Sequence, residues 1–239
     1  MLPIAHSELV QLVRNRPVLV TSLLMPVAAS VFFIGFRDVF ARIGSLGYVA
    51  AVLVMTIAAF SLYATTVTTL ASRRQNLFLK RLRSTAVGDA AILSGLVLPV
   101  TAIAVVQVAV ILAVFAAVGG APHDAPLLVV AVLATFAMLL ALGIATAGIT
   151  TSPEHAQVTT LPLSLGTVVV SSWVGITGTE SLPLLKRLLP GGAATELVVD
   201  AWNGGAALSD SLLLLAPTLA WVVVAVALAG RMFRWEPRR

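Results

Sequence analysis

Long uncharged apolar runs alternate with short polar segments along this chain, and six of these runs reach about twenty residues. A helix of that length, if predominantly apolar, crosses the ~30 Å hydrocarbon layer of a membrane. None of the runs alternates apolar and polar residues over ~10 positions, as the strands of a membrane barrel do. The pattern therefore predicts an all-α integral membrane protein. Its six predicted transmembrane helices are 17–36, 43–72, 90–122, 125–153, 156–179 and 211–230.

The composition supports a membrane location and predicts the orientation of the chain. The 239 residues are 59% hydrophobic and 10% charged, with a net charge of +5, and such a composition is outside the range of soluble globular domains. The basic residues flank the apolar runs, so their simplest role is to keep the connecting loops on the cytoplasmic side rather than to bind nucleic acid. Eleven of the 15 Lys and Arg residues lie before residue 17, at 73–89 or after residue 230. The positive-inside bias therefore places both termini and the 73–89 loop in the cytoplasm.

Two further segments outside the predicted spans have a helical pattern. Residues 3–16 place apolar residues on one helical face, which suits a short helix in the cytoplasmic interface, with a frayed tail as the alternative. Residues 180–210 are too long and too apolar for a simple connection. We expect two short helices there, broken at 190–192, which re-enter the outer leaflet between the fifth and sixth spans. With no linker in the sequence, the whole chain (1–239) is predicted to form a single transmembrane domain.

The stretch SRRQNLFLKRLRST (72–85) holds five of the 15 basic residues between two uncharged runs. On a helical wheel over 73–86, its apolar residues share one arc, so we predict an amphipathic helix within the 73–89 loop. Such a helix can simply anchor the loop to anionic lipid, at ~1 kcal/mol per basic residue. Leu77 lies in the basic arc, however, and an apolar side chain on a charged face suits a groove on a partner, which leaves docking open beside anchoring. The apolar arc contains Phe78, Leu79, Leu82 and Ala86, and the basic residues are Arg73, Arg74, Lys80, Arg81 and Arg83.

Three motifs, taken in order, resemble those of type-2 ATP-binding-cassette (ABC) exporter permeases. RRQNLFLKRLRSTAVG resembles that family's first cytoplasmic loop, and SPEHAQVTTLPLSLGTVVVSSWVGITG its passage from the second cytoplasmic loop into the fifth span. LPGGAATELVVDAW is similar to its re-entrant helical pair between the fifth and sixth spans. With the six-span plan, the resemblance covers nearly the whole chain. Two features depart from it: the acidic residues that often precede the basic helix are absent, and Ala86 replaces the usual proline.

The resemblance implies a transport subunit whose energy comes from a partner. The chain contains no G-x-x-x-x-G-K-[ST] motif to hold nucleotide phosphates, and no charged residue lies deep inside a predicted span, where a proton relay would need one. The resemblance therefore implies a separate cytoplasmic P-loop ATPase that carries ATP and magnesium, and a working unit of two permeases and two ATPases. We expect a permease homodimer in the plasma membrane, in contact with lipid and with no cofactor of its own. The residues expected to dock or couple to the ATPase are Arg73, Arg74, Leu77, Phe78, Lys80, Arg81, Arg83, Glu154, His155 and Gln157.

Few residues mark a path for a substrate. Small hydroxyl residues in the second and fifth spans either let helices pack closely or line a cavity, and Gln107 offers an interhelical bond or a substrate contact. Because the predicted spans carry no charge, the permeant is expected to be apolar or amphipathic, either drug-like or lipid-like, and to move outward. The candidate path residues are Thr65, Gln107, Thr160 and Ser164.

Other functions agree less well with the sequence. A secondary carrier or channel is disfavoured because neither intramembrane charge nor an inverted repeat is evident, and a non-transporting membrane scaffold is a further alternative. An intramembrane enzyme would need clustered carboxylates for a metal or a buried Ser with a His. All three His residues (His6, His123 and His155) lie at or beyond span ends. Glu154 and His155 could form an acid–base pair, but a solvated loop is the better interpretation of these two residues. We expect neither catalysis nor a metal site, and the absence of cysteine excludes disulfides and thiol chemistry.

Overall fold

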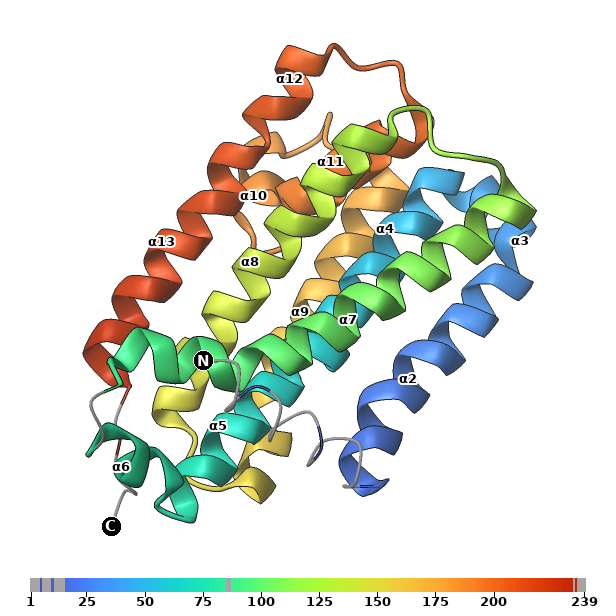
Figure 1. Cartoon of the computed structure of the whole chain (residues 1–239). Coiled ribbons are helices and arrows are strands. Elements are labelled where there is room, and N and C mark those ends of the chain that lie inside the picture. The colour runs from blue at the N-terminus through green and yellow to red at the C-terminus, as the bar shows by residue number, and fades with distance from the viewer. Residues whose placement is uncertain (1–4, 6–9, 11–15, 85–86, 234, 236–239) are drawn as a thin grey trace.

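The structure is a computed structural model that describes residues 5, 10, 16–84, 87–233 and 235, without the side chains of 16–22 and 25. The helix predicted at 3–16 therefore lies almost wholly outside the described residues. Within them every regular element is helical, which confirms the predicted all-α fold (Figure 1). The helices are α2 (Arg16–Gly35), α3 (Arg37–Ile43), α4 (Leu46–Ile57), η1 (Ala58–Ala64), α5 (Thr65–Gln75), α6 (Phe78–Arg83), α7 (Asp89–Gly119), α8 (Ala125–Ile149), α9 (Pro153–Thr177), α10 (Pro183–Leu188), α11 (Gly192–Asn203), α12 (Leu208–Leu213) and α13 (Leu215–Met232).

Five stretches of the described chain are helical, long and apolar enough to cross a membrane. They coincide with the second to sixth predicted spans, and α2 covers the first. In Figure 1, α2 begins and α13 ends at the lower end of the bundle, where α6 also lies, whereas α11 and α12 lie toward the upper end. The five stretches are Leu46–Gln75, Asp89–Gly119, Ala125–Ile149, Pro153–Thr177 and Leu208–Met232.

The continuous helix α4–η1–α5 forms the centre of the bundle. All but one residue of α4 are buried, and α4 contacts α2, α7, α9 and α11, whereas η1 and α5 contact α8. The sequence LGYVAAVLVMTI is apolar all round rather than on one face, and a helix of that kind is stable where every side is covered. The helices α2, α7, α8, α9 and α11 pack around this one, and α13 packs along α8 on the outside (Figure 1).

The middle of the central helix is π-helical over Ala58–Ala64. In a π-helix each N–H bonds to the carbonyl five residues back, and such segments are rare and often lie at functional sites. Neighbouring hydroxyls bond to carbonyls of this segment: Ser164 Oγ donates to Ala59 O (3.3 Å) and Thr65 Oγ1 to Phe60 O (3.4 Å). The sequence pattern did not predict this change of helix type.

Two short helices, α10 and α11, form a hairpin that enters the bundle from its upper end. At its tip Gly191 (φ +95°) has the left-handed conformation that favours glycine, and a Cβ there would lie 3.0 Å from Met55 Cε and 3.6 Å from Thr167 Cβ. Thr167 lies ten residues before the end of α9, which corresponds to about 15 Å of helix. The tip therefore reaches well below the upper end of α9. The predicted pair of short helices broken at 190–192 is confirmed.

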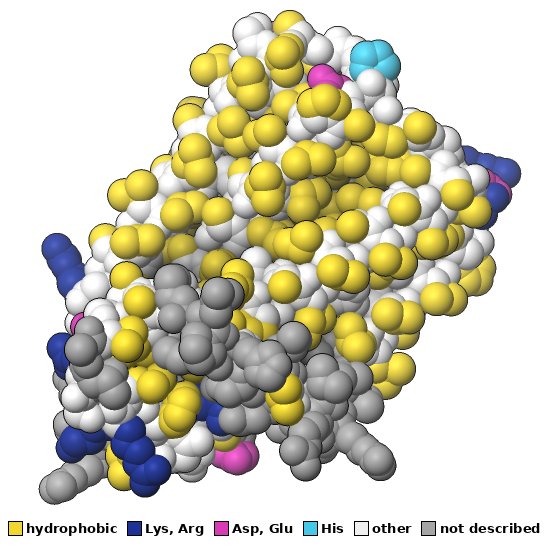
Figure 2. All heavy atoms as spheres, viewed as in Figure 1, with side chains coloured by type: hydrophobic (Ala, Val, Ile, Leu, Met, Phe, Trp, Pro, Cys, Tyr) yellow, Lys and Arg dark blue, Asp and Glu magenta, His cyan; other side chains and the backbone are white. Residues whose placement is uncertain are grey.

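The outer surface of the bundle is largely apolar. Figure 2 shows many hydrophobic side chains across the visible face, with Lys and Arg toward the lower end and in a smaller group at the right edge. Residues that point outward include Val106 and Val110 of α7, Val158 and Val169 of α9, and Val223 of α13. An apolar surface of this extent on helices of this length is typical of proteins embedded in lipid.

Candidate functional site

The basic segment at the lower end is a helix, a turn and a second helix, so the single helix predicted over 73–86 is wrong. α5 ends at Gln75, and Leu77 adopts a left-handed conformation (φ 62°) before α6 begins at Phe78. Asn76 promotes this turn, because its Oδ1 accepts a hydrogen bond from Phe78 N (3.1 Å). A left-handed conformation costs a residue such as leucine roughly 1–2 kcal/mol. The turn nevertheless holds the Leu77 side chain 43% exposed at the end of α5.

The short helix α6 has the two faces that the sequence predicted. Leu79 is buried, Phe78 and Leu82 are partly buried against the core, and the basic side chains of α6 are exposed. Arg83 lies 3.5 Å from Asp89 Oδ1 and its guanidinium carbon 5.2 Å from the centre of the Trp235 ring. The exposed basic residues of α6 are Lys80, Arg81 and Arg83, and Arg73 on α5 lies with its guanidinium carbon 5.7 Å from the centre of the Phe78 ring.

Arg74 does not join this exposed surface. Its residue is 1% exposed, and its guanidinium donates to two backbone carbonyls at the end of α8, Ala147 O through Nη1 (2.9 Å) and Thr150 O through Nη2. The last carbonyls of a helix have no partner within the helix and carry partial negative charge. Arg74 satisfies that of Ala147 and also the carbonyl of Thr150, the residue that caps the helix. The Arg74 side chain is therefore buried, whereas a docking residue is expected to be exposed.

The second cytoplasmic loop, by the predicted orientation, lies between α8 and α9. Ser152 caps α9 by accepting a hydrogen bond from His155 N (3.1 Å), and Pro153 occupies the first helical position. Glu154, His155 and Gln157 are all exposed on the first turns of α9. His155 Nδ1 lies 3.0 Å from Thr151 Oγ1 and accepts a hydrogen bond from Thr151 N (3.4 Å), so its ring contacts Thr151 rather than Glu154.

The four candidate path residues are buried between helices of the same chain. Gln107 of α7 accepts a hydrogen bond from Ser61 of η1 (2.6 Å), and within the described residues its Nε2 has no partner. Thr160 Oγ1 donates to Ala156 O (2.7 Å). The bond from Ser164 to η1 and that from Thr65 within the central helix were described above. In this conformation these side chains occupy packed interfaces.

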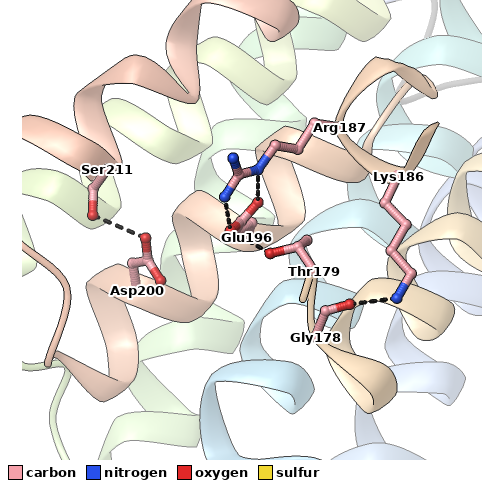
Figure 3. A network of polar contacts seen from close by, with 7 residues as sticks. All are labelled: Gly178, Thr179, Lys186, Arg187, Glu196, Asp200 and Ser211. Carbon is pink, nitrogen blue, oxygen red and sulfur yellow. Dashed lines mark hydrogen bonds and ion pairs between the residues drawn. The ribbon is translucent and has the colours of Figure 1, made fainter. Parts of the chain in front are cut away.

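A second polar cluster, absent from the sequence prediction, surrounds Lys186 at the upper end (Figure 3). The residue is 0% exposed. Its Nζ donates to Thr177 Oγ1 (2.8 Å), Gly178 O (2.6 Å) and Ser181 Oγ (3.2 Å), and lies 5.1 Å from the centre of the Trp173 ring. The three donors of the ammonium group each have an acceptor. Lys186 thus attaches the hairpin to the end of α9.

The neighbouring residue, Arg187, forms a two-pronged ion pair with Glu196 across the hairpin (Figure 3). Both contacts are 2.7 Å, and Glu196 also accepts from Thr179 Oγ1 (2.6 Å). The hydrogen bond to Glu196 raises the pKa of Arg187 further above its ordinary value. Burial raises the pKa of Asp200, and the hydrogen bond it accepts from Ser211 (2.9 Å) opposes that shift. Within the described part of the chain, no three His, Asp or Glu side chains gather as metal ligands would.

Comparison with known protein families favours a transporter among the candidate functions. Residues 17–231 match the family model described as ABC-2 family transporter protein. The chain belongs to the ABC-2 transporter family. This ABC-2 protein is therefore the membrane domain of an ABC-type transporter, and the family implies an ABC ATPase subunit as its partner. A search of curated proteins finds no match.

Proposed function

We propose that this ABC-2 protein is the permease subunit of an ATP-driven exporter, and that its ATPase partner docks on α6 and the adjoining turn. The feature that carries the docking proposal is Leu77, which is held exposed in a left-handed conformation between two basic helices. Unfavourable backbone conformations persist where the surroundings hold them, and they cluster at functional sites. Leu77 with the half-buried Phe78 provides the apolar contact of the docking surface, and the basic residues around them provide its charge complementarity.

The exposed start of α9 is the second part of the proposed ATPase contact. Glu154, His155 and Gln157 point outward from its first turns, at the same end of the bundle as α6. ATP and magnesium bind to the partner, because this sequence has no phosphate-binding motif. The ATPase thereby acts on two loops of the permease, and its movement passes into the bundle through α5 and α9.

The proposed arrangement in the plasma membrane has six spans with both termini in the cytoplasm. α2 is the first span, the helices α3, α10, α11 and α12 lie toward the outer side, and α10 re-enters the outer leaflet. Exposed leucines on α10 support its contact with lipid, namely Leu184, Leu185 and Leu188. The working unit is a permease homodimer with two ATPases. Its permeant is apolar or amphipathic, because the candidate path residues carry no charge.

The proposed function is tested by purifying the tagged permease from its native membrane and identifying what accompanies it. We expect a P-loop ATPase with the parent chain and little or none with Leu77→Glu or Phe78→Glu, because a carboxylate beside the apolar contact costs desolvation. Both variants are expected to insert and fold normally, since neither side chain is fully buried. Recovery of the ATPase with both variants would reduce the segment to a lipid anchor, and its absence from the parent would favour a scaffold.

The orientation has its own test, because the chain contains no cysteine and single cysteines are therefore unambiguous labels. Ser84 at the end of α6 and Ser209 in α12 are both exposed, at opposite ends of the bundle. A membrane-impermeant maleimide is expected to label Ser209→Cys in intact cells, and Ser84→Cys only after permeabilisation. The reverse pattern would contradict the orientation that the basic loops predict.

A further inference from the structure

Arg74 occupies an unusual place for a cation in the basic segment, because it is buried while Arg73 is half-buried and the basic residues of α6 are exposed. It lies on the last turn of α5, and its own carbonyl accepts a hydrogen bond from Leu77 N (3.1 Å). The backbone of the exposed Leu77 is therefore bonded directly to the residue whose guanidinium grips the end of α8. Arg74 thus connects the turn at Leu77, through its backbone carbonyl, to the end of α8, through its guanidinium.

The grip of Arg74 includes the loop as well as the helix. Ala147 belongs to α8, whereas Thr150 is the first residue after it. Thr150 is itself buried, and its hydroxyl lies 3.0 Å from Thr159 Oγ1 of α9. The guanidinium is a planar fork with several donors and can hold two carbonyls at a fixed angle, which the single ammonium group of lysine cannot do.

The end of α8 is in turn fixed to the last helix. A Cβ added at Gly148 would lie 2.9 Å from the carbonyl carbon of Met232, so the two backbones are in direct contact there. Movement of the α8 end away from Arg74 would therefore also displace α13. The end of α8 is therefore the common contact of α5, the α8–α9 loop and the end of α13.

We propose that Arg74 is a positioning residue that ties the docking segment α6 to the α8–α9 loop, so that both loops move together when the ATPase acts. The proposal rests on the proposed function for the source of the movement, but the tie itself is a property of the permease alone. Arg74 consequently acts through the backbone of two loops and makes no contact with ATP, substrate or the ATPase. We thereby replace its predicted docking role with one inside the chain.

The tie is tested on the purified permease alone by amide hydrogen exchange. We expect Arg74→Met to raise exchange in α6 and in residues 150–155 together, by roughly tenfold, which is within the range found for mutations along a coupling network. Arg74→Lys keeps the positive charge but loses the planar guanidinium, and it is expected to give a smaller increase in exchange in the same two segments. It replaces Arg74→Met in the experiment if that variant cannot be purified. Arg231→Met is the matched control, since Arg231 is an exposed cation at the same end of the bundle. Unchanged exchange, or a change confined to one segment, overturns the tie.

The consequence for transport is measured in proteoliposomes that contain the permease with its ATPase. Arg74→Met is expected to retain the ATPase, because Leu77 and Phe78 are unchanged, while the amount transported per ATP hydrolysed falls by roughly tenfold. Loss of the ATPase together with transport would instead make Arg74 part of the docking surface and overturn the proposal. If the parent retains no ATPase, the proposed function fails, and the exchange measurement still decides whether Arg74 links the loops.

Discussion

Gly192→Ala is expected to prevent closure of the α10–α11 hairpin and to sharply reduce the amount of folded protein. A Cβ at this position would overlap the carbonyl oxygen of Lys186, which belongs to the backbone and cannot rotate away. Gly192 is the first residue of α11 and is bonded through its N–H to Leu189 O (3.0 Å). Relieving the overlap would separate α10 from α11, at an expected cost of about 3 kcal/mol or more.

For Gly192→Ala, the steric overlap and the helix propensity change stability in opposite directions, so the direction of the measured change distinguishes them. Alanine favours a helix over glycine by about 1 kcal/mol, so a loss of stability must come from the steric overlap. Gly166→Ala in α9 is the matched control, because no atom lies within 4 Å of the added Cβ. We expect membrane yield and melting temperature in detergent to fall for Gly192→Ala and to stay level or rise for Gly166→Ala. Equal behaviour of the two variants would contradict the close approach within the hairpin.

Lys186→Met is expected to destabilise the protein by about 2–4 kcal/mol, because it leaves buried acceptors without their donor. Methionine has a similar length and fills the same space, so the loss isolates the hydrogen bonds and the charge from packing. The carbonyl of Gly178 at the end of α9 would lose the ammonium group 2.6 Å away. Trp173 would lose the cation beside its ring.

Arg187→Met provides the comparison for Lys186→Met on the adjacent residue. The Arg187 side chain is partly exposed, and its pair with Glu196 is expected to contribute roughly 0–1 kcal/mol. Thermal unfolding followed by tryptophan fluorescence should therefore show a large fall for Lys186→Met and a small one for Arg187→Met. If the larger fall occurs with Arg187→Met, the exposed ion pair rather than the buried lysine holds the hairpin to α9.

The long elements could be predicted from the sequence because membrane thickness fixes their length. The uncharged runs at 43–72 and 125–153 correspond closely to Leu46–Gln75 and Ala125–Ile149. The Pro-Gly-Gly sequence likewise predicted the break between α10 and α11. The lengths of apolar runs contain no information on hydrogen-bond spacing, so the π-helical segment Ala58–Ala64 could not be predicted from them.

The candidate site was only partly predictable. The division of α6 into an apolar and a basic face follows from its periodicity, but the turn before it depends on Asn76 bonding to Phe78 N, a local contact that a helical wheel ignores. The burial of Arg74 did have a signal. Val67, Leu70 and Arg74 follow the three- and four-residue spacing of one helical face, and all three are buried. The helical wheel over 73–86 and the family resemblance place Arg74 on the outward basic face, whereas continuing the buried face of the preceding helix places it inside.

The π-helical segment in the middle of the continuous helix α4–η1–α5 also determines the direction in which the turn at Leu77 faces. Each residue of an α-helix advances by about 100° around the axis, and wider i→i+5 turns need more residues for each revolution. Ala58–Ala64 thus sets the angle between the upper half of this span and α5. The helical pitch of η1 therefore fixes the direction in which Leu77 and Arg74 point around the helix axis, although both residues lie beyond η1 along the chain. A return of η1 to α-helical pitch would rotate the lower half of the span about its own axis without breaking the helix.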